Sequence, residues 1–279
     1  VVEISNTLDS KVRVPVSQAG GVWYVNGDDL YGLSDEESTI TIPVKSDYDY
    51  TVDMPAWITG EKVKEGYNFT LTENTTGNAR KGTVIFKSQK GTKEITFVQF
   101  GVNDIAGTYE ATYSTFGEGD DWVSETVKIE LLQGEENEAV FYADGLSSIR
   151  GVVLPLKFDG ETYQLSALNG QYLGFIESQK WYLYTIVRSE AGYVHADTSL
   201  SYPAIAELDV DDEELMPFFP FKDKKGFSFT GETGTIKSFI DAIGVYVFAS
   251  KSPTFGNNNN LGYYDIFKDL SIKKIKADH

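Results

Sequence analysis

The sequence predicts an all-β protein, and two observations carry this prediction. Apolar side chains recur at every second residue in many short segments, as in 38–44, where Ile40, Ile42 and Val44 fall on one face of an extended strand. These segments are separated by Gly, Asn, Asp and Ser, which are the residues that tight turns require. Helical periodicity is confined to 235–243 and 211–216, so we expect antiparallel strands with one or two short helices.

A domain boundary is predicted near residue 102. Residues 93–101 have the pattern of a terminal strand, Asn103 and Asp104 interrupt it, and residues 105–109 open a new series. The formal net charge of −18 is unevenly divided, because residues 1–102 carry −4 and residues 103–279 carry −14. We therefore expect two domains, 1–102 and 103–279, joined by a short linker.

The composition excludes several classes of function. The chain has no cysteine and two histidines, which excludes disulfides, thiol nucleophiles and cysteine-based metal sites. A net charge of −18 argues against nucleic acid and anionic membranes as partners, because both attract clustered Lys and Arg. No apolar run is long enough to predict a transmembrane segment, and nothing predicts a cofactor.

Residues 23–102 contain an ordered series of segments: the strand 48–52, the segment 55–58 with Trp57, the glycine- and asparagine-containing stretch 74–86, and the closing strand 95–101. In this order they resemble the BACON domain. This resemblance implies an immunoglobulin-like β-sandwich. Such domains recur in secreted and surface proteins of gut bacteria, beside glycan-active modules, and the family name records a suggestion of carbohydrate binding.

The resemblance also implies a location and a role. It places the chain outside the cytoplasm, and we expect a lipoprotein anchored in the outer membrane at the cell surface, with its anchor outside this chain. It further implies that the N-terminal domain is a spacer. Trp57 is expected in the sandwich core rather than in a sugar site.

The C-terminal domain is expected to be a β-barrel or a two-sheet sandwich. Its candidate strands are 108–114, 122–132, 139–143, 151–158, 163–167, 172–176, 181–188, 226–230, 244–249 and 270–275. Residues 107–109 and 169–174 weakly resemble lipocalin-like domains of secreted gut-bacterial proteins, and this resemblance bears on the fold alone.

Two of these strands, 181–186 and 245–248, are apolar on both faces. One face would fill the domain interior. The apolar side chains of the other face must also be shielded from water. The N-terminal domain, a helix, a ligand or a partner could shield them, and shielding by the same chain is the favoured alternative.

The candidate ligand-binding residues are Trp122, Asn258, Asn259, Tyr263 and Tyr264. A sugar presents C–H faces to aromatic rings and hydroxyls to planar amides, and a run of four asparagines, 257–260, precedes the two tyrosines. The alternative interpretations are a polar turn before a strand and, for Trp122, a core residue at a strand edge.

A weak metal candidate is the acidic run that contains Asp209, Asp211, Asp212 and Glu213. Closely spaced carboxylates can bind calcium, but the run lacks the glycine and the twelfth-position glutamate of an EF-hand loop. A solvated loop or the first turn of a short helix is the favoured alternative.

Catalytic motifs are absent from the sequence, and His195 is expected to be structural or exposed. We therefore predict that the protein is not an enzyme. The leading hypothesis is a glycan-binding protein that takes a polysaccharide or host glycan. The alternatives are a structural or adhesive surface protein that binds another protein, and, less favoured, a hydrolase.

Overall fold

The computed structural model describes residues 2–5, 11–14, 21–117, 121–211, 215–231, 234–256 and 258–276. The chain divides into two compact units that are described separately. The first unit comprises residues 1–31, 37–72 and 82–97, and the second comprises 32–36, 73–81 and 98–279. Two segments from the first hundred residues, 32–36 and 73–81, therefore belong to the second unit.

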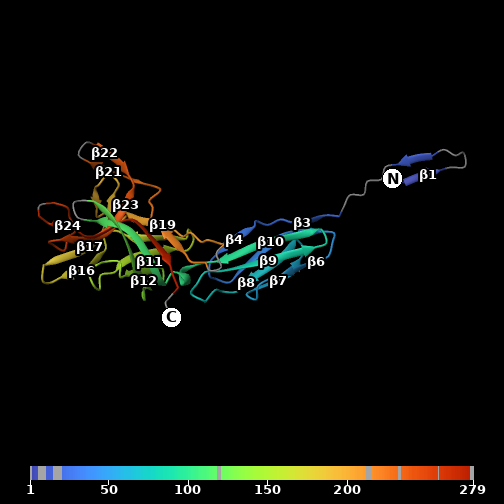
Figure 1. The fold of residues 1–279 in the computed structure, drawn as a ribbon, viewed down its shortest axis with the longest axis horizontal. Coiled ribbons are helices and arrows are strands. Elements are labelled where there is room, and N and C mark those ends of the chain that lie inside the picture. Colours follow the sequence, from blue (N-terminus) through green and yellow to red (C-terminus); the bar gives the residue numbers. More distant parts are fainter. Residues whose placement is uncertain are drawn as a thin grey trace. The chain divides into compact units, whose positions relative to one another are not determined.

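The first unit is a β-sandwich (Figure 1). Its strands are β1 (Val2–Ser5), β2 (Lys11–Val14), β3 (Trp23–Val25), β4 (Leu30–Leu33), β5 (Ser38–Ser46), β6 (Tyr50–Asp53), β7 (Ile58–Val63), β8 (Gly66–Leu71), β9 (Arg80–Ser88) and β10 (Gly91–Gln99). The sheets have the orders β4-β10-β9-β6 and β3-β5-β8-β7, and β1 and β2 form a separate hairpin. The ring of Phe69 in β8 contacts those of Phe86 and Phe97 in the opposite sheet at 5.8 and 5.6 Å.

The second unit contains the remaining strands. They are β11 (Gly107–Phe116), β12 (Trp122–Gln133), β13 (Val140–Asp144), β14 (Leu154–Asp159), β15 (Gln164–Leu168), β16 (Tyr172–Ile176), β17 (Trp181–Ser189), β18 (Val194–His195), β19 (Ser201–Ile205), β20 (Phe218–Pro220), β21 (Phe227–Gly231), β22 (Gly234–Ser238), β23 (Ile240–Phe248) and β24 (Asn260–Lys274). A short 3-10 helix, η1 (Val102–Asp104), precedes β11.

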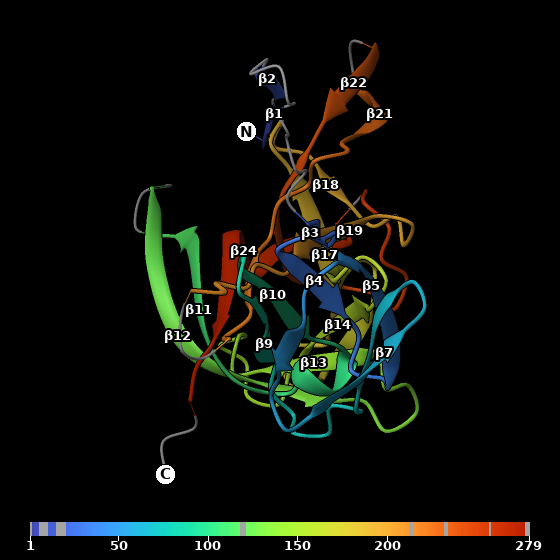
Figure 2. The same ribbon diagram turned by 90° about the vertical axis from the view of Figure 1, so that its right-hand side faces the viewer.

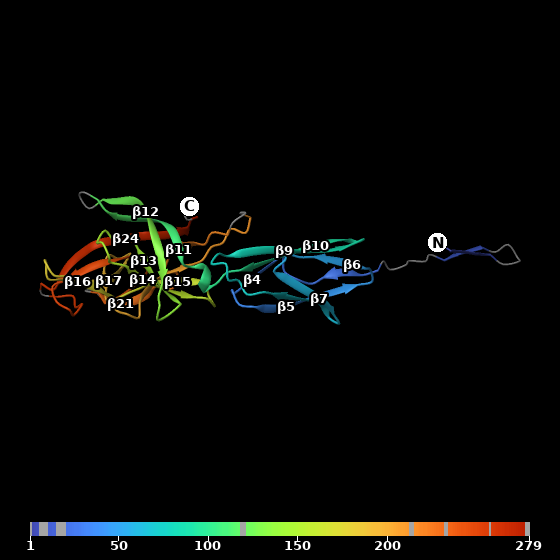
Figure 3. The same cartoon turned by 90° about the horizontal axis from the view of Figure 1, so that it is seen from below.

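Twelve of these strands form one curled antiparallel sheet, shown from two directions in Figures 2 and 3. Its order is β16-β17-β23-β24-β11-β12-β13-β14-β15-β19, with β18 paired to β17 and β20 paired to β24. Isolated bridges join Ala204 to Phe221 and Glu207 to Phe218, so the pairings lead from the β19 segment back through β20 to β24. The long β11–β12 hairpin, green in Figure 2, extends past the end of its pairing with β24.

The interior of this curled sheet holds the main core, in which Tyr109, Phe141, Phe219 and Phe267 are buried. A second cluster lies on the other face of β17 and β23 and consists of Tyr184, Ile186, Tyr246 and Phe248.

This second cluster is covered by parts of the same chain. Val194 and Ala196 pack against it, and the ring of Phe255 lies 5.5 Å from that of Phe248. The structure therefore confirms intramolecular cover for strands that are apolar on both faces, and the cover comes from β18 and the loop that precedes β24.

The prediction of a helix over 235–243 is wrong. Residues 234–238 form β22 and Ile240–Phe248 form β23, in which all nine residues are buried. Because both faces of β23 are covered, its apolar residues need not alternate, and a run of this kind imitates a helical pattern. The other expected helix, 211–216, lies mostly outside the described residues. Within the described ranges, no helix is long and apolar enough to cross a membrane.

Candidate functional site

Trp122 begins β12, opposite Phe116 at the end of β11. Their ring centroids are 4.7 Å apart with an interplanar angle of 31°. Both side chains remain accessible, since Phe116 is 50% exposed and Trp122 is 36% exposed. The hairpin therefore presents a pair of aromatic rings to solvent instead of placing Trp122 in the core.

Two cations from distant strands lie against Trp122. The guanidinium carbon of Arg188, in β17, is 5.4 Å from the ring centroid, and Lys268 Nζ, in β24, is 5.5 Å from it. Asp241 Oδ2 accepts a hydrogen bond of 2.6 Å from Arg188, which fixes the guanidinium in place. Phe116, Trp122, Arg188, Asp241 and Lys268 are called the hairpin surface below.

Asp241 gives this surface a buried carboxylate. Its side chain is only 8% exposed, and its Oδ1 atom has no hydrogen-bond partner among the described residues. Burial raises the pKa of Asp241, while Arg188 opposes this effect. Arg188, whose side chain is 20% exposed, is therefore the member of this pair that a ligand could reach, as a planar donor.

The structure places the two predicted tyrosines on opposite faces of β24. Tyr263 packs on Tyr246 at 4.8 Å, and its hydroxyl donates to the Ile186 carbonyl at 3.3 Å. Burial raises the pKa of Tyr263. Tyr264 is 48% exposed, and its ring lies 6.3 Å from Trp181. A single ligand on one face of β24 would therefore not contact both tyrosine rings.

We expect Tyr263→Phe to lower the free energy of unfolding by about 1 kcal/mol, because it leaves the Ile186 carbonyl without this donor. Tyr264→Phe is the matched control and should change stability by less than about 0.5 kcal/mol, since that hydroxyl is on an exposed side chain. Urea denaturation measures both values. Equal stability of the two variants would contradict a structural role for the Tyr263 hydroxyl.

The predicted asparagines shape the loop before β24. Asn259 Nδ2 donates to the carbonyls of Ser252 and Thr254 at 2.8 and 2.9 Å, and its Oδ1 accepts from Ser250 Oγ at 2.7 Å. Asn258 is exposed and has a positive φ of 66°. Asn257 lies outside the described residues. The contacts of Asn259 thus serve the loop that carries Phe255 over the second cluster.

The acidic run is described only in part. The backbone N–H of Asp211 donates to Asp209 Oδ1 at 3.0 Å, which is a local turn contact. Asp212 and Glu213 lie outside the described residues. In the part of the chain that the structure describes, no three His, Asp or Glu side chains are grouped as metal ligands would be.

The structure reveals a buried carboxyl pair that sequence reasoning missed. Asp104, in η1, is fully buried, Asp35 is 4% exposed, and a side-chain hydrogen bond joins them. Asn74 Nδ2 and the Gly101 N–H donate to Asp104, and the Asn103 N–H donates to Asp35. Burial, together with Asp35, raises the pKa of Asp104 to about 8, so Asp104 holds the shared proton at neutral pH.

The carboxyl pair has two basic neighbours. Lys274, itself 6% exposed, donates to the carbonyls of Gly77 and Asp104 at 2.9 and 2.7 Å. Arg80 Nε donates to Gln99 Oε1 at 2.9 Å, and both carboxyls act on the guanidinium electrostatically. The sequence signal for this cluster was only the turn-forming composition around Asp35, Asn74 and Asp104, which does not predict burial.

His195 packs against two aromatic rings, with ring centroids 4.8 Å from Phe227 and 4.5 Å from Phe229. Its Nε2 atom lies 3.4 Å from Ser189 Oγ, and burial lowers its pKa while Asp197 opposes this. A serine, a histidine and an aspartate thus lie close together. Ser189 is fully buried, however, so this hydroxyl is not accessible as a nucleophile in the structure.

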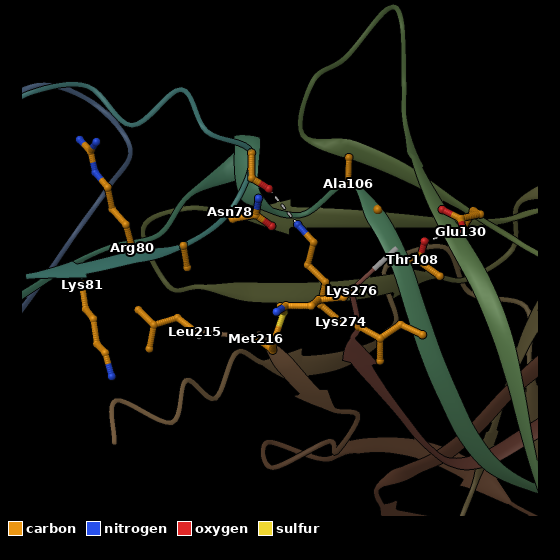
Figure 4. Close-up of a pocket in the computed structure, with 14 residues that line it drawn as sticks. Asn78, Arg80, Lys81, Ala106, Thr108, Glu130, Leu215, Met216, Lys274 and Lys276 are labelled. Atoms are coloured by element: carbon orange, nitrogen blue, oxygen red, sulfur yellow. Dashed lines mark hydrogen bonds between the residues drawn. The ribbon is translucent and has the colours of Figure 1, made fainter. Parts of the chain in front are cut away.

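A cavity of about 910 Å³ lies in the second unit beside Thr108 and Glu130 (Figure 4). Arg80 and Lys81 of β9 lie on one side, Lys274 and Lys276 on the other, and Met216 lies between them. No residue proposed from the sequence as a ligand contact lines this cavity.

Comparisons with known proteins show no family for this chain. No protein-family model matches the sequence, and no curated protein matches it. The chain is similar to the crystal structure of a protein of unknown function from Bacteroides ovatus, with a TM-score of 0.29 and 8% sequence identity. That similarity covers 86% of this chain and 97% of the other, and its TM-score is too low to carry an argument.

Proposed function

We propose that this protein is a non-catalytic glycan-binding protein and that the hairpin surface contacts the sugar. The observation that supports it is the exposed pair of Phe116 and Trp122 beside the ion pair of Arg188 and Asp241. Exposed rings offer an apolar surface to the C–H groups of a pyranose. The neighbouring Arg188 guanidinium supplies planar donors for its hydroxyls.

The charges on this surface favour a neutral glycan. Arg188 is paired with Asp241, and Lys268 is paired with Asp269 at 2.6 Å. Each cation therefore has a carboxylate beside it, and the surface has no large excess of either sign. A glycan without carboxylate or sulfate groups would incur the smallest electrostatic cost there, given a chain of net charge −18.

A glycan array followed by titration calorimetry tests this proposal. We expect at least one neutral glycan class to bind, and Trp122→Ala to weaken its Kd by about tenfold or more, because the stacking surface is lost. Tyr142→Ala is the matched control, since Tyr142 is an aromatic residue of β13 that is 39% exposed. The proposal fails if no glycan binds or if Trp122→Ala binds as tightly as Tyr142→Ala.

The burial of the closely paired carboxyl groups supports the non-catalytic part of the proposal. Acid–base hydrolysis of a glycoside needs two carboxyl groups that reach the substrate. Asp35 and Asp104 are a closely paired set of carboxyls among the described residues of the second unit, and both are buried. Incubation with chromogenic glycosides should therefore release no product, and turnover that survives repurification would contradict this proposal.

The resemblance of residues 23–102 to the BACON domain supports a further proposal on location. We propose that the first unit is a spacer and that the protein lies outside the cytoplasm, as a surface lipoprotein of a gut bacterium. Digestion of intact cells with an added protease checks the location, because a cytoplasmic protein would be protected.

A second candidate function is binding to another protein. The observation that favours it is β16, which pairs in the described sheet with β17 alone and exposes Tyr172 and Phe175 by 49% and 37%. Unpaired strand edges accept an extended segment of a partner. A negative glycan array, together with a partner whose binding is lost in Tyr172→Glu, would favour this alternative.

A further inference from the structure

A smaller cavity, of about 280 Å³, lies against β19 in the second unit. The buried residues of β19 alternate with Ser201, Pro203 and Ile205, which therefore share the outer face of the strand. These three residues line the cavity, together with Gln164 of the neighbouring strand β15, which is paired with Ile205. Two paired strands thus give the cavity a fixed floor that contains both polar and apolar groups.

The loop 222–226, between β20 and β21, forms another part of the wall. The Lys222 N–H donates to the Pro203 carbonyl at 2.7 Å, which ties the loop to β19. Asp223 Oδ1 accepts from the N–H groups of two later loop residues at 3.0 and 2.9 Å, and its Oδ2 accepts from the Ile240 N–H at 3.0 Å. The chain's own hydrogen bonds therefore hold the loop in one shape, so a ligand need not order it.

Three lysines of this loop, Lys222, Lys224 and Lys225, line the cavity and have exposed side chains. Within the described ranges, none of their ammonium groups takes part in an ion pair. Asp223 is the one carboxylate among the described lining residues, and both of its oxygens already accept hydrogen bonds from the backbone. The wall therefore offers three unpaired cations, in a chain whose net charge is −18.

The acidic residues nearest in sequence to the lining segments are Glu161, Asp197, Glu207 and Asp241. All four belong to the described part of the chain, and none of them lines the cavity. Asp241 is paired with Arg188 on the hairpin surface. The lysines are therefore the charged side chains that an entering ligand meets first.

We propose that this cavity binds the sulfate or phosphate ester group of a small hydroxylated ligand. Ammonium groups act as compact point charges, and three of them can bind separate oxygens of one tetrahedral anion. No arginine occurs among the described lining residues, so the planar two-bond contact that favours a carboxylate is missing there. The volume of about 280 Å³ lies near the lower limit of small-molecule pockets, roughly 300 Å³, which suits one charged group and part of its carrier.

The remaining lining groups fit the hydroxylated part of such a ligand. Gln164 Nε2 donates to Ser166 Oγ at 2.8 Å, so its Oε1 can accept a hydrogen bond from a ligand hydroxyl. The Ser201 hydroxyl can donate or accept in the same cavity. The Phe227 ring adds an apolar surface, and its packing against His195 at 4.8 Å holds it in place.

This proposal does not depend on glycan binding at the hairpin surface, because no residue of that surface lines this cavity. The alternative is that the three lysines serve only to keep an exposed loop solvated. A solvated loop would attract anions weakly, without saturation and without a preference for one anionic group. Saturable and selective binding therefore distinguishes the two interpretations.

Titration calorimetry at constant ionic strength tests the proposal with glucose 6-sulfate, glucose 6-phosphate, glucuronate and glucose. We expect saturable binding of one or both esters, with a Kd at least about tenfold lower than that of glucuronate, and no binding of glucose. Binding of one ester alone identifies the group as a sulfate or as a phosphate. The absence of saturable binding of both esters, or equally tight binding of glucuronate or glucose, overturns the proposal.

Substitution of the lysines locates the binding within the molecule. We expect Lys222→Gln/Lys225→Gln to raise the Kd of the bound ester by at least about tenfold, since two contacts to the anion are removed. Lys45→Gln/Lys64→Gln is the matched control, because it removes the same charge from exposed positions that do not line the cavity. An equal Kd in these two double variants overturns the proposal.

A carboxylate placed on the cavity floor provides a second, independent test. Ile205 is 47% exposed, so Ile205→Glu should fold, and its carboxylate should repel the ester and raise its Kd by at least about tenfold. Leu261→Glu is the matched control, because Leu261 is 51% exposed and does not line the cavity. Equal binding by these two variants would contradict a site on β19.

Trp122→Ala separates this proposal from glycan binding at the hairpin surface. We expect this variant to bind the ester with the Kd of the wild type, because Trp122 does not line the cavity. Loss of ester binding in a folded Trp122→Ala protein would place the anion at the hairpin surface and overturn the cavity site. Retained ester binding together with a negative glycan array would leave this site in place while the glycan proposal fails.

Discussion

Raising the pH from about 5 to about 8 is expected to destabilise the folded protein through Asp104. In the folded state, burial and the neighbouring Asp35 raise the pKa of Asp104 from 3.8 to about 8. The folded protein therefore retains a proton that the unfolded chain has already lost. Stability is highest below the unfolded pKa and is lost as the pH rises through the folded one, at roughly 1 kcal/mol per pH unit.

The groups around Asp104 set the size of this effect. Lys274 opposes the rise in the pKa of Asp104, and the Gly101 N–H does the same by donating to the carboxylate. Arg80 and Tyr109 also interact electrostatically with Asp104. His195 contributes a slope of opposite sign, since its pKa is lowered by burial and its folded form resists protonation as the pH falls.

Asp104→Asn isolates the contribution of Asp104. An asparagine amide imitates the protonated carboxyl because it can donate to Asp35, so the variant should match the wild type near pH 5 and exceed its stability near pH 9. Urea denaturation across this range measures the slope in both proteins, and the exposed Asp211→Asn is the control. A parallel pH profile for wild type and Asp104→Asn would contradict a shared proton in the buried pair.

Gly244→Ala is the second change with a large expected effect. Gly244 lies in the middle of β23, where an added Cβ would meet the Asp265 carbonyl oxygen at 2.2 Å and Tyr263 Cδ1 at 2.8 Å. Both distances are too short for any real contact, and one of the obstacles is backbone. The strand pair of β23 and β24 must therefore separate locally, and we expect a loss of about 3 kcal/mol.

The matched control for this change is Gly32→Ala in β4. No heavy atom lies within 4 Å of a Cβ added at Gly32, so its stability should change by less than about 0.5 kcal/mol. Near-ultraviolet circular dichroism and urea denaturation report the two outcomes, because Tyr246 lies in β23 and Tyr263 contacts it from β24. A Gly244→Ala protein as stable as Gly32→Ala would show that β23 and β24 do not pack as described.

Local pattern was a reliable guide to most strands. The segment 38–44 lies within β5, whose exposure alternates along its length, and the predicted strand 172–176 coincides with β16. A half-buried strand must alternate polar and apolar residues whatever its partners are, so its sequence alone reveals it. The pattern failed in the predicted helix 235–243, whose second half is the start of β23, because a strand buried on both faces has no polar side to mark its period.

The candidate sites depended on contacts between residues that are distant in sequence. Trp122 was proposed from its own surroundings, but the cations against it belong to β17 and β24, and Arg188 is held there by Asp241 of β23. Tyr263 and Tyr264 are adjacent in the chain and were proposed together. The pleat of β24 separates them, since neighbouring side chains of a strand point to opposite faces.

The sequence by itself determined the all-β class, because alternation and turn composition are properties of short segments. Only the tertiary structure decided which polar groups are buried and which basic side chains lie close together. Asp35, Asn74, Asp104 and Lys274 meet through loops and strands separated by up to about 240 residues, and no local pattern encodes such a meeting. Burial and the pairing of distant strands set the pKa of Asp104, which therefore depends on the folded arrangement of the second unit.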